Sequence, residues 1–127
     1  MSSESDLQIT VVAWLQLVLP PGSVIHHSPN EGRHVVQYRV KQKRLGVRAG
    51  WPDLEIFVEK TWWRTDVRWS PIFIELKTQK GRVSPAQKAV QAELEEAGCH
   101  VKTCRSIEDV QQFLEELLNL GGQKNEG

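Results

Sequence analysis

Asp53, Glu75 and Lys77 are the residues whose types and spacing could do chemistry together. Asp53 begins one predicted strand, residues 53–58, and the other two lie in a second predicted strand, residues 71–77. If these strands pair through the segment between them, the start of the first lies beside the end of the second. The two carboxylates then converge, with the ammonium group close by. Carboxylate oxygens suit Mg²⁺ or Mn²⁺, and the lysine could orient or deprotonate an attacking water.

Both predicted strands alternate aliphatic and polar positions, which is typical of strands with one buried face. The aliphatic positions are Leu54, Ile56 and Val58 in the first strand and Ile72, Ile74 and Leu76 in the second. We expect these side chains to be buried and the acids to lie on the reverse face. The simpler interpretation of Glu75 and Lys77 alone is an exposed pair on a sheet, which contributes only a few tenths of a kcal/mol.

The ordered motifs around these residues resemble a known family. Pro52-Asp53 followed by Glu75-Leu76-Lys77 resembles the PD-(D/E)XK nuclease motif. Gly46 to Leu54, Phe73 to Lys77 and Ser84-Pro85-Ala86-Gln87 together resemble the stand-alone VRR-NUC (virus-type replication-repair nuclease) domain of phages and bacteria. Asn30-Glu31-Gly32 adds to this resemblance, which covers the whole chain. Residues 59–70 are its least typical part.

The resemblance implies roles for particular residues. Asp53 and Glu75 would bind the metal together with the backbone carbonyl of Leu76, and Lys77 would handle the nucleophilic water. Gln87 would support the site, although it also stands three residues after Ser84, where a helix-capping glutamine belongs. A further acid is expected from the first helix. Glu4 is the better match and Glu31 the alternative, whereas Glu55 shares the face of Asp53 but has no place in the motif.

The remaining elements follow from apolar periodicity and capping signals. We expect helices over 5–19 (capped by Ser5 with Gln8), 33–45, 84–97 and 106–118, and short strands over 23–27 and 99–104. Residues 59–70 are expected to form a hairpin extension. The order α-β-α-β-β-α-β-α predicts an α/β fold, a restriction-endonuclease-like core with a mixed β-sheet flanked by helices. We assign residues 1–120 to a single nuclease domain and 121–127 to a polar tail.

Basic residues concentrate in the middle of a chain that is neutral overall, with 16 basic and 16 acidic residues. Residues 33–88 hold 13 of the basic residues but five of the acidic ones. A basic segment suggests a polyanionic partner, although a solvated helix face is the plainer interpretation of the clustering alone. The residues expected to hold DNA phosphates are Arg33, Arg39, Lys41, Lys43, Arg44, Arg48, Lys80 and Arg82.

Composition narrows the class of protein further. The chain has 127 residues, 39% of them hydrophobic and 25% charged, which is ordinary for one globular domain. No apolar run is long enough to span a membrane, and the first residues lack the pattern of a signal peptide. Cys99 and Cys104, five residues apart in one predicted strand, would face opposite sides and are poorly placed for a disulfide. These features are typical of a cytoplasmic protein with reduced thiols.

Together the residues and the resemblance predict a Mg²⁺- or Mn²⁺-dependent endonuclease acting on DNA. By the resemblance, branched DNA such as a Holliday junction is the expected substrate, and a homodimer would supply two sites for two matched nicks. The tryptophan-rich segment 59–70, with Trp62, Trp63 and Trp69, is the preferred subunit contact if those side chains do not simply pack. Two alternatives are a DNA-binding module without catalysis and a restriction-type nuclease that reads sequence. His26, His27 and Asn30 faintly suggest a histidine-asparagine nuclease site, but no further histidine follows in the required arrangement.

Overall fold

A four-stranded mixed sheet forms the centre of the protein in the computed structural model, which describes residues 3–29 and 36–121. The strands are β1 (Val24–His27), β2 (Leu54–Phe57), β3 (Ile72–Leu76) and β4 (His100–Cys104). They lie in the order β1-β2-β3-β4. β1 and β2 pair antiparallel, as do β2 and β3, whereas β3 and β4 are parallel. This arrangement confirms the predicted element order and fold class.

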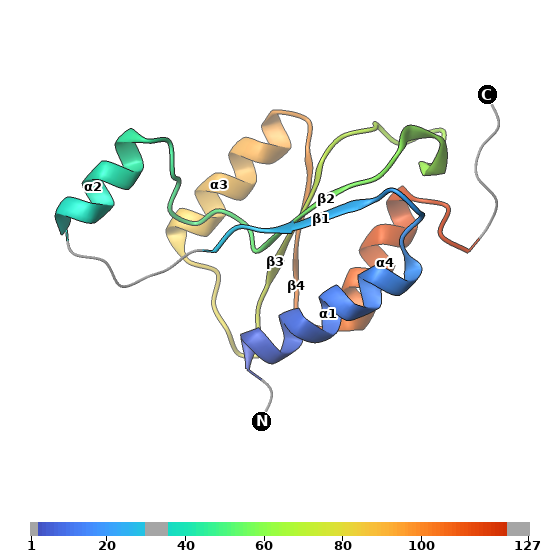
Figure 1. Ribbon diagram of the computed structural model, residues 1–127, viewed down its shortest axis with the longest axis horizontal. Helices are drawn as coiled ribbons and strands as arrows, with labels where there is room; N and C mark the ends of the chain where they lie inside the picture. Colours follow the sequence, from blue (N-terminus) through green and yellow to red (C-terminus); the bar gives the residue numbers. More distant parts are fainter. Residues whose placement is uncertain (1–2, 30–35, 122–127) are drawn as a thin grey trace.

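The helices are α1 (Glu4–Val18), α2 (Val36–Arg44), α3 (Pro85–Glu96) and α4 (Ile107–Leu117). α1 and α4 cover one face of the sheet, while α3 lies on the other face, against β4 (Figure 1). None of the described helices is long and apolar enough to cross a membrane. Both cysteines are free thiols, and Cys104 is buried.

The core lies between the sheet and the α1–α4 layer. The predicted aliphatic faces of β2 and β3 point into this layer, where Leu54, Ile56, Ile72 and Ile74 are fully buried. The apolar stripes of α1 and α4 close it from the other side, with Val11, Leu15, Val110 and Leu114 also fully buried. Burying an aliphatic side chain of this size contributes about 1.5–3 kcal/mol, so this layer is the main source of the stability that holds β2 and β3 side by side.

β3 differs from its prediction because it is buried on both faces. It is flanked by β2 and β4, and α3 covers part of the face opposite the core, so all five of its residues are buried. Glu75 retains 2% of its surface and is therefore not the exposed acid that alternation alone suggests. Residue alternation reports which side chains share a face, whereas the burial of that face depends on a helix from elsewhere in the chain.

Two local predictions are wrong. α1 begins at Glu4 rather than residue 5, because Ser3 and Asp6 form a capping box: the Asp6 N–H donates to Ser3 Oγ, and the Ser3 N–H donates to Asp6 Oδ2. Residues 59–70 are not a β-hairpin extension. They contain a short 3-10 helix, Lys60–Trp62, and Trp63 pairs in a single bridge with Leu118 after α4.

Segment 59–70 is instead part of the packing around the end of α4. Trp63 retains 2% of its surface, and its indole N–H donates to the carbonyl of Val58 at 3.0 Å. Trp62 is half-buried against the same core. These two side chains therefore pack inside the domain and do not form the exposed subunit contact expected from the sequence. Trp69, with 57% of its surface exposed, is the exception.

Candidate active site

Asp53 and Glu75 converge where β2 begins and β3 ends. Antiparallel pairing places Leu54 opposite Ile74, so the residues on either side of this pair meet at one end of the sheet. Oδ2 of Asp53 accepts a hydrogen bond from the Leu76 N–H at 2.7 Å. This bond fixes one carboxylate oxygen of Asp53 directly beside the strand that carries Glu75.

Glu75 lies in an environment that disfavours its charged form. Burial, followed by the hydrogen bond and negative charge of Asp53, raises the pKa of Glu75 from 4.5 to about 8, and Lys77 partly opposes this increase. Oε1 of Glu75 is buried and accepts no hydrogen bond from an N–H or O–H group of the described residues, so the hydrogen bond between Glu75 and Asp53 requires a proton on one of the two carboxyl groups. A buried carboxyl oxygen without a donor is rare in folded proteins, and here either a proton shared with Asp53 or a bound cation would satisfy it.

Gln87 makes contacts that suit both of the roles considered from the sequence. Its side-chain Oε1 accepts from the Ser84 backbone N–H at 2.8 Å, and its backbone N–H donates to Ser84 Oγ. These two bonds form a complete capping box at the start of α3. Its Nε2 donates to Oε2 of Glu75 at 3.1 Å. One side chain therefore begins the helix and orients the buried carboxylate.

The other predicted acids and the lysine are placed differently. Lys77 is half-buried directly after β3, and its charge lowers the pKa of Glu75. Glu4 is the first residue of α1, is exposed, and is close enough to raise the pKa of Glu75 slightly. Glu31 lies outside the described residues. Among the described residues, no three His, Cys, Asp or Glu side chains gather closely enough to hold a metal. A cation held by Asp53 and Glu75 would therefore take its further ligands from other groups.

The residue types at this site fit a divalent cation. Two carboxylates with an unsatisfied buried oxygen are the donor set that Mg²⁺ and Mn²⁺ take, and Mg²⁺ completes its shell from carbonyls, waters and phosphate. The predicted carbonyl ligand belongs to Leu76, the residue whose N–H donates to the Asp53 carboxylate.

The predicted phosphate-binding residues fall into three groups. The basic residues of α2 are exposed, as are Lys80 and Arg82 in the turn between β3 and α3. Arg48 instead donates to Glu93 of α3 at 2.8 Å, so its charge is already paired. Arg33 lies outside the described residues. The first group keeps its charged groups at the surface of the protein, where phosphates can reach them.

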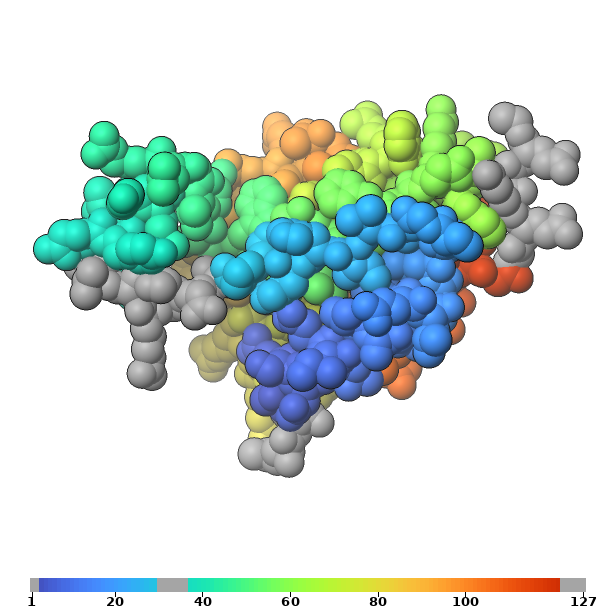
Figure 2. Space-filling model, in the orientation of Figure 1, coloured from blue at the N-terminus to red at the C-terminus, as the bar shows by residue number. Residues whose placement is uncertain are grey.

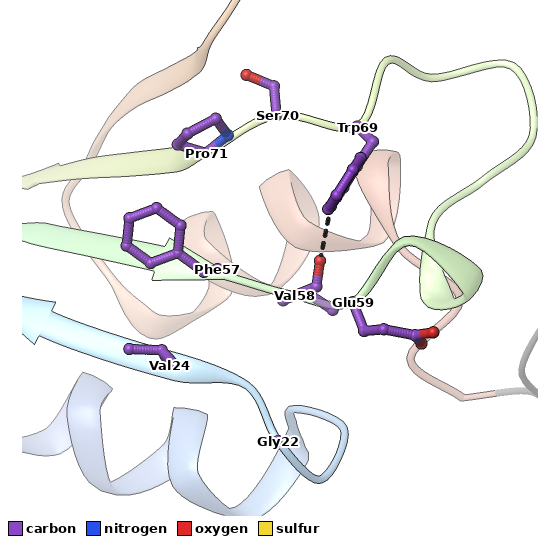
Figure 3. A pocket seen from close by; sticks show the side chains of 8 residues that line it. All are labelled: Gly22, Val24, Phe57, Val58, Glu59, Trp69, Ser70 and Pro71. Atoms are coloured by element: carbon purple, nitrogen blue, oxygen red, sulfur yellow. Dashed lines mark hydrogen bonds between the residues drawn. The ribbon is translucent and has the colours of Figure 1, made fainter.

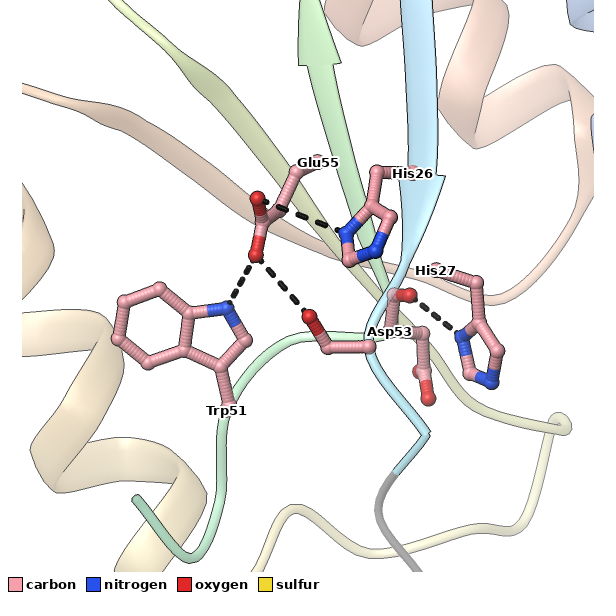
Figure 4. A network of polar contacts seen from close by, with 6 residues as sticks. His26, His27, Trp51, Asp53 and Glu55 are labelled. Atoms are coloured by element: carbon pink, nitrogen blue, oxygen red, sulfur yellow. Dashed lines mark hydrogen bonds and ion pairs between the residues drawn. The ribbon is translucent and has the colours of Figure 1, made fainter. Parts of the chain in front are cut away.

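The sequence reasoning missed two residues that shape the surroundings of the site. Arg105 follows β4, and its Nη1 donates at 2.7 Å to the carbonyls of Thr78 and Gly81, which holds the turn that follows Lys77. Glu55 accepts from the Trp51 indole at 2.7 Å and from the Ser28 hydroxyl at 3.1 Å (Figure 4). The contacts of Arg105, and that of Glu55 with Ser28, join segments that the fold alone brings together, so sequence spacing could not reveal them. Trp51, in contrast, lies only four residues from Glu55.

Gly50 brings the chain that leads into Asp53 against the first turn of α3. Its φ is +85°, and a Cβ there would lie 2.6–2.7 Å from backbone atoms of Ala86 and Gln87. Because glycine has no Cβ, the chain that enters β2 can lie directly against the first turn of α3, and no other residue would fit at this position.

We expect Gly50→Ala to lower the free energy of unfolding by about 2–4 kcal/mol, from steric overlap and the left-handed backbone together. Gly46→Ala is the matched control, because Gly46 has a φ of +99° with nothing within 4 Å of its Cβ position. It should show only the backbone cost of about 1–2 kcal/mol. Urea denaturation of both variants measures the difference, and equal losses would contradict the close-approach argument.

A four-stranded mixed sheet with two carboxylates, a lysine and a glutamine at one end defines a nuclease-type α/β domain. The family model for the VRR-NUC domain matches residues 2–108, and the chain belongs to this family. A nuclease domain of this family implies DNA as the substrate.

Two solved structures share the fold. One, described as a VRR_NUC domain protein, is 26% identical, covers 94% of this chain and 91% of its own, and superposes with a TM-score of 0.70. The second, described as a VRR_NUC domain, is 17% identical, covers 90% of this chain and 97% of its own, and has a TM-score of 0.57. No curated protein sequence matches the chain closely enough to count as a relative.

Proposed function

We propose that the protein is a metal-dependent endonuclease that hydrolyses phosphodiester bonds in DNA. The observation that carries the proposal is the pairing of Asp53 with a buried Glu75 whose Oε1 accepts no hydrogen bond from an N–H or O–H group of the described residues. Keeping a carboxylate in that position costs stability, so the arrangement is best explained by a cation that the two groups hold.

Each residue has a distinct task in this proposal. Asp53, Glu75 and the Leu76 carbonyl hold Mg²⁺ or Mn²⁺, which supplies a Lewis acid for the scissile phosphate and a more acidic water. Lys77 orients the attacking water, assists its deprotonation and balances charge on the phosphate. Gln87 keeps Glu75 in place, and Glu4 is the further acid at the rim, with Glu31 as the alternative.

DNA binding is assigned to the exposed basic residues of α2 and of the turn that follows β3. α2 carries Arg39, Lys41, Lys43 and Arg44, and Lys80 and Arg82 follow the catalytic strand. Such side chains bind phosphates at any sequence, so they position the duplex without reading its bases. This pattern supports recognition of DNA shape over recognition of a particular sequence.

Metal removal tests the proposal directly. DNA cleavage by the wild-type protein should require added Mg²⁺ or Mn²⁺ and should stop when a chelator is added, because two carboxylates alone cannot polarise a phosphate. Asp53→Asn should lose cleavage while retaining DNA affinity in Ca²⁺. Cleavage in excess chelator would refute the metal assignment. DNA binding without cleavage in any metal would instead identify the protein as a DNA-binding module without catalysis.

The proposed substrate is branched DNA, with a homodimer supplying two sites for paired nicks. We assign the contact between the two subunits to an apolar pocket of about 430 Å³, which lies at the end of β2 away from Asp53. Val24, Phe57 and Trp69 are among the residues that line it (Figure 3). These three side chains expose 53%, 41% and 57% of their surfaces. An exposed apolar cluster with an aromatic anchor suits a symmetric contact between two copies.

We expect a homodimer in light scattering that nicks a four-way junction at least tenfold faster than a linear duplex of the same sequence. Trp69→Ala should yield monomers that cut junction strands singly, whereas Leu17→Ala, at an exposed residue outside that pocket, should leave the dimer intact. A monomeric wild-type protein that cuts both substrates equally would contradict the junction proposal and leave the nuclease proposal standing.

A further inference from the structure

The turn 78–81 directly follows Lys77 at the end of β3. The Gly81 N–H donates to the Thr78 carbonyl at 3.1 Å, which closes a β-turn. This turn lies beside the start of α1 (Figures 1 and 2), and both line a hollow of about 670 Å³. Since the described residues do not pack tightly against the turn on that side, its position depends on hydrogen bonds.

Arg105, the first residue after β4, supplies hydrogen bonds to this turn. Its Nη1 donates to the carbonyls of Thr78 and Gly81, each at 2.7 Å, and to the carbonyl of Gln79 at 3.3 Å. The backbone of Arg105 is itself held, because its N–H donates at 2.9 Å to Oδ2 of Asp109 in the first turn of α4. Three carbonyls of one turn therefore converge on one guanidinium nitrogen that is anchored to α4.

The closed turn lies against the side chain of Lys77. The Lys77 N–H donates to the Cys104 carbonyl at 3.0 Å, which extends the pairing of β3 with β4 and fixes the lysine backbone. A Cβ on Gly81 would lie 3.4 Å from Cδ of Lys77, so Gly81 lies beside the alkyl stem of the lysine. The backbone bond sets where the lysine begins, and the position of Gly81 limits where its ammonium group can point.

An arginine suits this task better than a lysine would. The guanidinium group is planar and carries five N–H donors in a fixed arrangement. Nη1 has two of these donors, one for each of the 2.7 Å bonds to the turn. A lysine ammonium ends about one bond short of the place of Nη1 and lacks the planar arrangement of donors. Exchange of Arg105 for lysine therefore weakens the contact with the turn while it preserves the positive charge.

We propose that Arg105 is a positioning residue of the nuclease: by closing the turn 78–81 it holds Gly81 against Lys77 and so orients the lysine toward the candidate active site. Arg105 touches neither the reacting phosphate nor a metal in this role. The inference rests on the proposed nuclease function, in which Lys77 handles the attacking water.

Two substitutions of Arg105 separate this role from DNA binding. Arg105→Lys should lower kcat by about 10- to 100-fold, the cost of a small misplacement of a catalytic group. Its DNA dissociation constant in Ca²⁺ should stay within about twofold of the wild-type value, because the charge is kept. Arg105→Met, which has neither donor nor charge, should lose cleavage to the same extent. Lys102→Arg, at an exposed position of β4, is the control and should match the wild type.

Wild-type kcat in Arg105→Lys would overturn the proposal, because the charge alone would then be sufficient. Weaker DNA binding by Arg105→Met in that case would assign the arginine to a phosphate contact instead.

Arg105 and Lys77 should not act independently in cleavage. Lys77→Met/Arg105→Lys should cleave DNA no more slowly than Lys77→Met alone, because Arg105 acts through the lysine. Gly81→Ala should lower kcat by about threefold or more, since its methyl group displaces the lysine stem by a fraction of an ångström. Gly81 does not have a left-handed backbone, so the methyl group is the change that matters.

Gly121→Ala is the matched control for Gly81→Ala, because no atom lies within 4 Å of its Cβ position apart from its chain neighbours. It should cleave at the wild-type rate. Losses that multiply in the Lys77–Arg105 double variant, or wild-type kcat in Gly81→Ala, would overturn the action of Arg105 through Lys77.

Hydrogen exchange supplies a readout that does not need cleavage. In metal-free Arg105→Lys, the Gly81 amide, which donates within the turn, should exchange at least about tenfold faster. The amides of β3 and α4 and the unfolding temperature should stay near their wild-type values. Glu95→Gln, at an exposed acid of α3, is the control and should match the wild type.

Unchanged exchange at Gly81 in Arg105→Lys would overturn the proposal, because the turn would then stay closed without the arginine. Equally faster exchange in α4 would also overturn it, by attributing the loss of cleavage to general destabilisation. A wild-type protein that is inactive in every metal would refute the nuclease function instead, and the exchange at Gly81 would still decide whether Arg105 closes the turn.

Discussion

Replacing Lys77 with methionine should lower the rate of DNA cleavage at saturating substrate by about 10²–10⁴-fold, the usual contribution of a positioned proton-transfer group. The lysine directly follows the buried strand β3, and its charge lowers the pKa of Glu75. Methionine has nearly the same length without the charge, and it packs well in half-buried positions.

The measurement is single-turnover cleavage together with DNA affinity in Ca²⁺. Affinity should change less than about threefold, because Lys77 is one charge among several near the DNA. Lys102→Met is the control, since Lys102 is an exposed lysine on β4 and has no part in the proposed site. A Lys77→Met variant with more than a tenth of the wild-type rate would remove the lysine from the proposed mechanism.

Glu75→Gln should stabilise the metal-free protein while abolishing cleavage. The folded protein holds a proton on Glu75 up to about pH 8, whereas the unfolded chain releases it near pH 4.5. The folded state therefore binds more protons in this window, and the free energy of unfolding falls as the pH rises from 4.5 to 8. Glutamine is neutral throughout, can accept the bond from Gln87, and can donate to Asp53.

The expected gain is about 1 kcal/mol or more at pH 8, or roughly 4 °C in unfolding temperature, and it should vanish near pH 4.5. Mn²⁺ should raise the unfolding temperature of the wild-type protein, because it binds the folded state, and should have little effect on the variant. Glu95→Gln is again the control. A Glu75→Gln variant that is less stable than the wild type at pH 8, or equally stabilised by Mn²⁺, would contradict the site.

Local signals in the sequence were sufficient for most of the fold. The Ser84-Pro85 start of α3, the Ser106 cap of α4 and the alternation in β2 each depend on neighbours within a few residues, and all three are confirmed. The N-cap of α1 lies at Ser3, two residues before the predicted Ser5, and serine is a favourable capping residue at both positions. The choice between them depends on Asp6, whose side chain completes the box with Ser3.

Only part of the candidate site could be predicted from the sequence. The convergence of Asp53 and Glu75 follows from the pairing of adjacent strands and could be predicted. The burial of Glu75 could not, because it depends on α3 crossing over from β3. The ion pair between Arg48 and Glu93 joins residues 45 positions apart, and no pattern in the sequence indicates it. The burial of Trp63 could not be predicted either, because its partners include His100 of β4 and Leu118 after α4.

The separation of α2 from the core has a consequence for how this protein can diverge. Mutations in a helix that makes few contacts with the other described elements carry little stability cost, so the charge of α2 can change while the sheet stays intact. Selection on substrate preference can then act on one surface insertion, and selection on chemistry on another part of the chain. A single small domain can in this way acquire new DNA targets without passing through inactive intermediates.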